Sequence, residues 1–320
     1  MYHRVAELPS DIWQVAVTPA NFEQHVRWLT THAQVLPLAE LVEQLKNKRL
    51  QRNAVALTFD DGYADNYLVA KPILDEYKVP VTFFVASGGI DQETEFWWDE
   101  LESLLLFTPH LPLCFDVIVA DQPLHFDLSP SEIELSEGLR RQHAQWDACT
   151  QSPPTHRSTL FLQLWQLLRP LPHDRQQQSL DQIRQWARVS PSTRPAYRSM
   201  RTAQLLDLGR SQLHDLGAHT VHHPALAAHA PAYQRQELLQ NKAYLEGLTG
   251  REISLVAYPY GNYNLDTLAV AAGTGFAAGF TTEAKPVSHR SDPYRLGRFQ
   301  VPNVPGSQFA EQLQRWQRQT

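Results

Sequence analysis

Two adjacent carboxylates stand where a predicted strand ends. Residues 54–59 form a largely apolar run, and Asp60, Asp61 and Gly62 follow it directly. Two neighbouring carboxylates can divide a hydrolytic reaction between them, one ligating a metal ion and the other accepting a proton from water. The same pattern is also typical of a polar turn that caps the next helix. The pair alone leaves both interpretations open.

Two histidines spaced four residues apart, His219 and His223, follow a short strand predicted at 216–219. Two imidazoles and a carboxylate suit a divalent transition metal and leave coordination positions open for water and substrate. A solvated pair of surface histidines is the alternative. Pro224 disfavours a helical conformation at His223, so the pattern does not require one helical face. We interpret His222, which lies between them, as a bystander.

A third loop, Ala257-Tyr258-Pro259-Tyr260-Gly261, follows an apolar strand predicted at 255–258. Its proline and glycine constrain the backbone, so the loop could present the N–H of Tyr260 to a developing oxyanion. A plain turn is the alternative interpretation.

These loops need strands whose carboxyl ends meet, because active-site residues of parallel barrels collect at that mouth. The alternation of apolar runs with helical periodicity predicts βα units. Strands are predicted at 54–59, 81–85, 216–219, 255–258 and 277–280, and helices at 18–29, 38–46, 65–77, 202–213, 233–247, after 265 and at 309–316. Residues 89–195 depart from this rhythm and are predicted to be an insertion. It contains a hairpin at 113–119 and 124–128 and glutamine-rich helices at 157–168 and 174–189.

Composition narrows the function classes. The chain has 320 residues, 42% of them hydrophobic, and a formal charge of −6. These values predict a soluble globular protein, and the absence of a basic block argues against nucleic-acid binding. No apolar stretch reaches the roughly 18 residues of a membrane span. The first residues lack a secretory signal pattern, which predicts a cytoplasmic location unless the native N-terminus is longer. Cys114 and Cys149 are interpreted as ordinary thiols in a reducing compartment.

In this order, the three loops resemble the polysaccharide deacetylase family, which is carbohydrate esterase family 4 or the NodB homology domain. The first motif of that family matches at Thr58 to Gly62, and the second, His-Ser/Thr-x-x-His, matches at His219 to His223. The third has Ala257 where arginine is usual, as in a branch with Ala-Tyr-Pro-Tyr-Gly and an N-terminal Tyr-His. The match covers about residues 1–88 and 196–301. The resemblance implies a single domain over 1–320, a distorted (β/α) barrel with a mostly helical insertion at 89–195.

The resemblance also implies a set of roles. A divalent metal ion, with zinc as the first expectation, would be held by Asp61, His219 and His223, and Asp60 would be the base. The metal ion would polarise the acetyl carbonyl, and together with the N–H of Tyr260 it would stabilise the oxyanion.

Two departures from the family pattern require substitutes. The late Leu-x-His motif that supplies the acid is absent, since the chain reads Leu296-Gly297-Arg298 there. His3 is the candidate that replaces it and His289 is the fallback, although a frayed terminal histidine is the alternative interpretation of His3. The second departure leaves Asp60 without its usual arginine. Arg298 is the candidate for that charge, and a structural surface ion pair is the alternative.

The tryptophans that open the insertion could face a sugar. Aromatic rings stack on sugar rings, so Trp98 is a candidate substrate-binding residue, with Asp99 bonding a hydroxyl group and Tyr260 also at the substrate. The alternative is that at least one of the two tryptophans, Trp97 and Trp98, belongs to a core.

We therefore predict a metal-dependent N-deacetylase that removes acetyl groups from N-acetylated amino sugars of a cell-surface or exported polysaccharide or its precursor. One alternative is an amidase of the same fold acting on a small nitrogenous compound such as a ureide. Another is a sugar-binding module with a decayed site. The sequence leaves the oligomeric state open.

Overall fold

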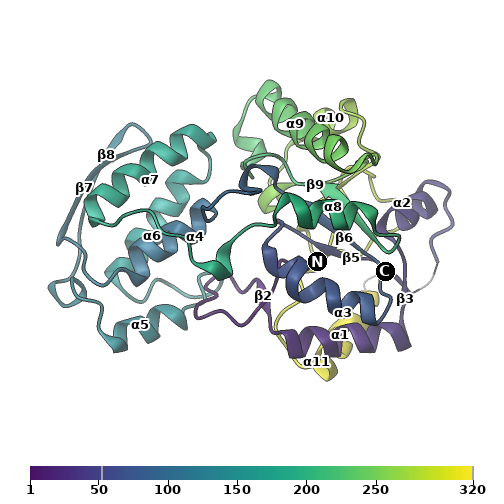
Figure 1. Ribbon diagram of the computed structural model, residues 1–320, viewed down its shortest axis with the longest axis horizontal. Helices are drawn as coiled ribbons and strands as arrows, with labels where there is room; N and C mark the ends of the chain where they lie inside the picture. Colours follow the sequence, from purple (N-terminus) through teal and green to yellow (C-terminus); the bar gives the residue numbers. More distant parts are fainter. Residues whose placement is uncertain (52, 319–320) are drawn as a thin grey trace. The chain divides into compact units, whose positions relative to one another are not determined.

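The computed structural model describes residues 1–51 and 53–318, and the chain divides into two compact units (Figure 1). We call Met1–Glu7, Val15–Gln92 and Ser199–Thr320 the barrel unit, and Leu8–Gln14 with Glu93–Arg198 the helical unit. The insertion expected at 89–195 falls almost entirely within the helical unit. Leu8–Gln14, which also belongs to the helical unit, was not predicted from the sequence to be separate from the barrel.

A five-stranded parallel sheet forms the centre of the barrel unit, in the order β11-β10-β9-β6-β5. The strands are β5 (Leu57–Phe59), β6 (Val81–Val85), β9 (His214–Ala218), β10 (Leu255–Ala257) and β11 (Ala278–Phe280). Single bridges extend it at both edges, from Tyr2 to Phe59 and from Phe280 to Leu296. All five residues of β6 are buried, as expected for a parallel strand covered on both faces. The predicted distorted (β/α) barrel is confirmed.

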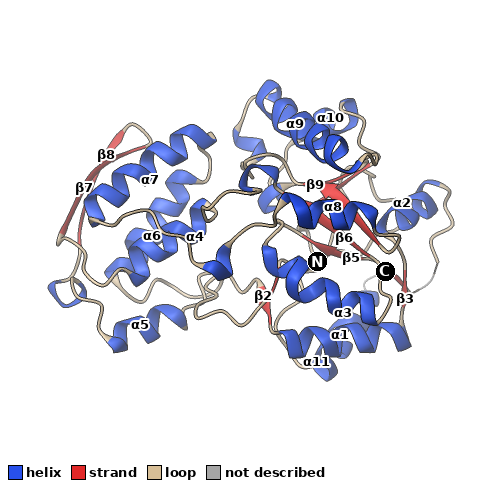
Figure 2. Cartoon of the chain, viewed as in Figure 1, coloured by secondary structure: helices blue, strands red, loops and turns tan. Residues whose placement is uncertain are grey.

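Helices surround this sheet (Figure 2). They are α1 (Pro19–His32), α2 (Leu38–Lys46), α3 (Lys71–Glu76), α8 (Thr202–Arg210), α9 (Pro231–Thr249), α10 (Leu265–Gly273) and α11 (Gly306–Gln317). Two short parallel pairs join β1 (Arg4–Val5) to β2 (Ala16–Val17) and β3 (Gln34–Val35) to β4 (Ala54–Val55). A π-helical turn at Asn66–Ala70 precedes α3, where the sequence predicted one continuous helix. Short 3-10 turns lie at Ser87–Gly89, Leu226–Ala228 and Pro259–Gly261.

Local signals account for the start of α1. Thr18 caps α1 by accepting a hydrogen bond from the N–H of Asn21, and Pro19 occupies the first turn. At the other end of the chain, the predicted helix at 309–316 is present as α11, which packs against α1 with Phe309 buried and its ring stacked on His25 at 4.2 Å.

The helical unit has a core of its own. It contains α4 (Trp97–Glu102), a π-helical turn at Ser103–Phe107, α5 (Glu137–Ala144), α6 (His156–Leu168), α7 (His173–Ala187) and 3-10 turns at Pro130–Glu132 and Pro195–Tyr197. The predicted hairpin is present as β7 (Cys114–Val119) paired antiparallel with β8 (Gln122–Asp127). Phe115 and Val119 face inward, while intervening positions are more exposed. Within the described residues, no helix combines the length and apolar character needed to cross a bilayer.

Candidate active site

The turn after β5 separates its two carboxylates. Asp61 has φ +75° and Gly62 has φ +87°, a left-handed pair that reverses the chain immediately after the strand. A Cβ atom at Gly62 would lie 2.9 Å from Cγ1 of Val85, so glycine is required both for its backbone angle and for the close packing. Because the backbone turns sharply at Asp61, this carboxylate and that of Asp60 meet different neighbours.

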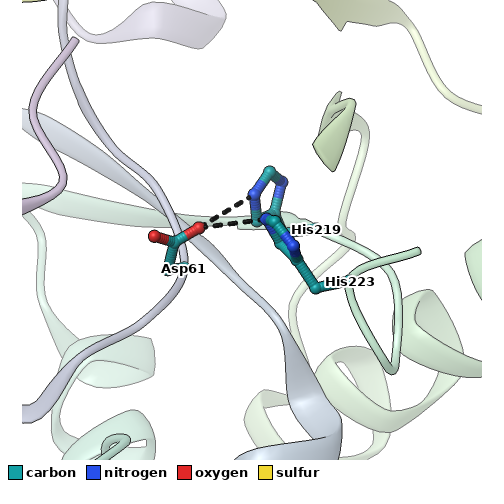
Figure 3. A group of neighbouring side chains, drawn as sticks. All are labelled: Asp61, His219 and His223. Carbon is teal, nitrogen blue, oxygen red and sulfur yellow. Dashed lines mark ion pairs between the residues drawn. The ribbon is translucent and has the colours of Figure 1, made fainter. Parts of the chain in front are cut away.

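Asp61 faces the two predicted histidines (Figure 3). Its Oδ1 lies 3.3 Å from Nε2 of His219 and 3.2 Å from Nε2 of His223. Nδ1–H of His219 donates to the carbonyl of Ala257 at 2.8 Å, which leaves Nε2 directed toward Asp61. Such a hydrogen bond orients an imidazole for metal binding. The three potential ligand atoms lie within 4.8 Å of one another, and all three residues are buried.

The charges of this group fit a divalent cation. Burial opposes ionisation of Asp61, but the contacts with His219 and His223 outweigh it and hold the pKa of Asp61 well below its usual range. Burial lowers the pKa of His223 despite the nearby carboxylate. An ionised carboxylate and neutral imidazoles are the protonation states that metal binding requires. The donor set therefore fits a metal ion with open positions for water and substrate.

Two side chains of helix α9 form hydrogen bonds with the loop that carries His219 and His223. Oε2 of Glu237 accepts hydrogen bonds from the backbone N–H groups of Val221 and His222, both at 2.9 Å, and its Oε1 accepts from Nδ1 of His222 at 2.8 Å. Asn241, one turn further along α9, accepts from the N–H of His219 at 3.1 Å. His222 is thus part of the loop's support. Glu237 and Asn241 were not predicted from the sequence, since their only local signal is their spacing of four residues.

Asp60 has a different partner. Nη1 and Nη2 of Arg298 donate to Oδ1 and Oδ2 of Asp60 at 2.7 and 2.6 Å, a bidentate pair. Arg298 is only 7% exposed and also donates to Oγ1 of Thr58 and the carbonyl of Thr281, so the surface interpretation of this arginine is wrong. Burial opposes ionisation of Asp60, but Arg298 outweighs it and lowers the pKa of the carboxyl group. The predicted pairing is present, and its role in catalysis stays a prediction.

The N-terminal segment lies against the edge of the sheet. The N–H of Tyr2 donates to the carbonyl of Thr58 at 2.8 Å, and the N–H of Asp60 donates to the carbonyl of Tyr2 at 3.1 Å. The ring of Tyr2 stacks on Phe59 with centroids 5.3 Å apart. The frayed-terminus interpretation is therefore wrong, because this segment continues the sheet beyond β5.

This pairing brings His3 beside both carboxylates. Burial lowers the pKa of His3, while Asp61 and Asp60 act in the opposite direction. His289, the fallback acid, lies in an exposed turn. The choice of His3 over His289 as the acid stays a prediction.

Tyr260 also lies at the site. Its φ is +57°, within the turn Pro259–Gly261, and its ring contacts that of His223 edge-on with centroids 4.4 Å apart. A Cβ atom at Gly261 would collide with Thr282, so this turn also requires glycine. The oxyanion and substrate roles of Tyr260 stay predictions.

Trp98 and Asp99 lie on α4 of the helical unit. Both residues are buried, the ring of Trp98 stacks on Phe96 at 4.5 Å, and Nη2 of Arg194 donates to the backbone carbonyl of Asp99 at 2.7 Å. These contacts agree with the core interpretation of the tryptophans. The assignment of Trp98 and Asp99 to substrate binding stays a prediction.

Comparison with known proteins agrees with these motifs. The family model for polysaccharide deacetylase matches residues 47–106 and 192–279. "Putative polysaccharide deacetylase YxkH" of Bacillus subtilis (strain 168) is 20% identical over 317 residues, covering 98% of this chain and 75% of the relative. Poly-beta-1,6-N-acetyl-D-glucosamine N-deacetylase of Staphylococcus aureus (strain MSSA476) is 33% identical over 84 residues, 26% of this chain and 29% of that protein.

Solved structures share the fold. The Streptococcus pyogenes deacetylase PplD in complex with acetate aligns with a TM-score of 0.54 and 18% identity, covering 98% of this chain and 95% of that one. IcaB from Ammonifex degensii aligns with a TM-score of 0.58 and 19% identity, covering 98% and 94%. The parallel sheet is thus shared with these solved structures. The chain is similar in sequence to the polysaccharide deacetylase family and is a hydrolase of carbon–nitrogen amide bonds.

Proposed function

We propose that this protein is a metal-dependent N-deacetylase of acetamido sugars in a polysaccharide or its precursor. One observation carries the proposal: a carboxylate held ionised by a buried arginine lies next to a carboxylate that faces two histidines. This arrangement provides a base and a metal site side by side. The relative from Bacillus subtilis, named for polysaccharide deacetylation and aligned over 98% of this chain, supports the same class of substrate.

Asp61, His219 and His223 would hold the metal ion, and zinc is the ion we propose. When bound, it would supply Lewis-acid polarisation of the acetyl carbonyl and lower the pKa of a coordinated water molecule. Two imidazole nitrogens and one carboxylate oxygen suit zinc but do not exclude its neighbours among the divalent transition metals.

The protein's own groups would move the protons. Asp60 accepts a proton as the water oxygen bonds to the acetyl carbonyl carbon, and the N–H of Tyr260 donates to the resulting oxyanion. His3, in its protonated form, donates a proton to the amide nitrogen as the carbon–nitrogen bond breaks. The products are acetic acid, which ionises to acetate, and a free amino sugar. Before the next cycle, Asp60 releases its proton to solvent and His3 takes one up from solvent.

A β-1,6-linked N-acetylglucosamine oligomer is the first substrate to test, since the relative from Staphylococcus aureus is named for that polymer. The intact pairing of Asp60 with Arg298 argues against a decayed binding module. We keep the export of the substrate and the cytoplasmic location of the enzyme as predictions.

The test measures acetate release from this oligomer and metal content together. Chelator treatment should abolish acetate release, and zinc should restore it. Asp61→Asn should lose both bound metal and activity, because the carboxylate ligand is replaced by a weaker neutral one. His289→Gln is the matched control and should leave both unchanged. Full activity in metal-free protein would refute the metal proposal, and ammonia release from a ureide without acetate release from sugars would establish the amidase alternative.

A further inference from the structure

Three side chains around His3 join the first residues of the chain to the loop that carries the catalytic carboxylates. We call Arg4, Asp65 and Asn66 the N-terminal clamp. Nε and Nη2 of Arg4 both lie 2.8 Å from Oδ2 of Asp65, and the backbone N–H of Val5 donates to Oδ1 of Asp65 at 3.0 Å. Nδ2 of Asn66 donates to the backbone carbonyl of His3 at 2.8 Å and to Oδ1 of Asp65 at 2.9 Å.

The clamp is buried. Arg4 is 1% exposed and Asn66 is fully buried, and the guanidinium of Arg4 lies over the ring of Tyr63 at 4.0 Å. A buried charge is retained only where it is paired and hydrogen-bonded, and removing one partner of such a pair is costly. The clamp is therefore a built interior contact and differs from an exposed ion pair.

The ring of His3 lacks a contact of this kind at Nδ1 within the part of the chain that the structure describes. Its Nδ1 is buried and has no hydrogen-bond partner among residues 1–51 and 53–318. An acid that must meet the leaving nitrogen needs a defined position, because small misplacements of a reacting group are expensive in rate. The position of His3 is instead fixed through its main chain, since Asn66 binds the carbonyl of His3 and Asp65 binds the two following residues.

We propose that Arg4, Asp65 and Asn66 are positioning residues that hold His3 toward Asp60 and Asp61, an inference that rests on the proposed role of His3 as the acid. Asp65 and Asn66 follow the Asp60-Asp61-Gly62 turn within a few residues. The turn that carries the base therefore leads directly into the helical residues that fix the main chain of the acid, which couples the two sides of the reaction mechanically.

The experiment compares two substrates on the metal-loaded enzyme. The amide of an N-acetylglucosamine oligomer needs a proton on its leaving nitrogen, whereas the phenolate of 4-nitrophenyl acetate leaves without one. Asp65→Asn and Asn66→Ala should lower kcat for the amide by about tenfold or more and change kcat for the ester by less than about twofold. Metal affinity should be unchanged. Asp75→Asn, which removes a carboxylate from the Lys71 and His214 pairs in the same unit, is the matched control and should change neither rate.

A double-mutant cycle separates this inference from the proposed function. If the clamp acts through His3, Asp65→Asn should have little further effect on the amide rate in a His3→Ala background. Unchanged amide rates in His3→Ala alone would overturn the acid role itself. A large loss in His3→Ala with full activity in both clamp variants would overturn the clamp and leave the acid role standing. Equal loss on both substrates, loss of metal, or additive effects in the cycle would show a general structural role and also overturn the inference. If Asp65→Asn does not fold, Asn66→Ala decides alone.

Discussion

Both units of this protein bury arginines, and two of these, Arg298 and Arg157, bind different kinds of partner. In the barrel unit, Arg298 holds both oxygens of the Asp60 carboxylate. In the helical unit, Arg157 is fully buried, and its guanidinium donates to the backbone carbonyls of Glu132, Thr108 and Ile133 at 2.6–2.8 Å. Burial lowers the pKa of Arg157 to about 10.

The difference shows that a buried charge does not by itself mark an active site. The carbonyls around Arg157 are neutral and already committed to the fold, so this arginine joins segments of the helical unit. The carboxylate that Arg298 holds still has lone pairs available, and the charges of His219 and His3 also act on it. A buried ion pair points to chemistry when its carboxylate also meets other titratable groups.

The largest expected effect concerns Arg298, the arginine that holds Asp60. Arg298→Ala should lower kcat by about a hundredfold to a thousandfold, because Asp60 loses both its orientation and its counter-charge. Arg298 lowers the pKa of Asp60, so its removal lets burial raise that pKa, and the acidic limb of the pH–rate profile should move to higher pH. Arg298→Lys, which retains charge without the bidentate geometry, should recover part of the rate. An unchanged rate and acidic limb would remove Arg298 from the mechanism.

Loss of Arg157 should instead lower stability and leave the catalytic rate nearly unchanged. Arg157→Met should destabilise the helical unit by about 2 kcal/mol, because several buried carbonyls lose their donors. Denaturant unfolding followed by tryptophan fluorescence measures this loss, because all tryptophans except Trp28 and Trp316 belong to the helical unit. Acetate release by the folded variant should stay within about twofold of wild type. A selective loss of kcat without loss of stability would break the comparison.

The smallest effect sharpens the comparison with a third buried charge. Glu237 binds backbone N–H groups, as Arg157 binds carbonyls, but it does so beside the residues that we propose as metal ligands. Glu237→Gln should weaken metal binding by about tenfold, a typical loss for groups that orient ligands. Competition with a chromophoric chelator measures the affinity. Gln240→Ala, at an exposed position of the same helix, is the control and should have no effect, whereas equal affinities in all three proteins would make Glu237 purely structural.

Much of the fold was predictable because its signals are local. The buried strand at Val81–Val85 and the capped start of α1 each follow from residues within a few positions. The hairpin of the helical unit also matched its prediction. Leu8–Gln14 was not predicted to belong to the helical unit, because its assignment depends on partners that are distant in the sequence. Ser10 donates to Glu102 at 2.7 Å and its carbonyl accepts from the hydroxyl of Tyr197, and no local pattern reports contacts of this kind.

The candidate site divides in the same way. The sequence by itself determined which chemical groups are available, since the two carboxylates, the two histidines and the tyrosine loop each occupy a turn directly after a strand. Only the tertiary structure decided that Arg298 reaches Asp60 across 238 residues and that His3 joins them from the other end of the chain. Turn and strand preferences arise from neighbouring residues, whereas these pairings exist only once the closed sheet brings its edges and loops together.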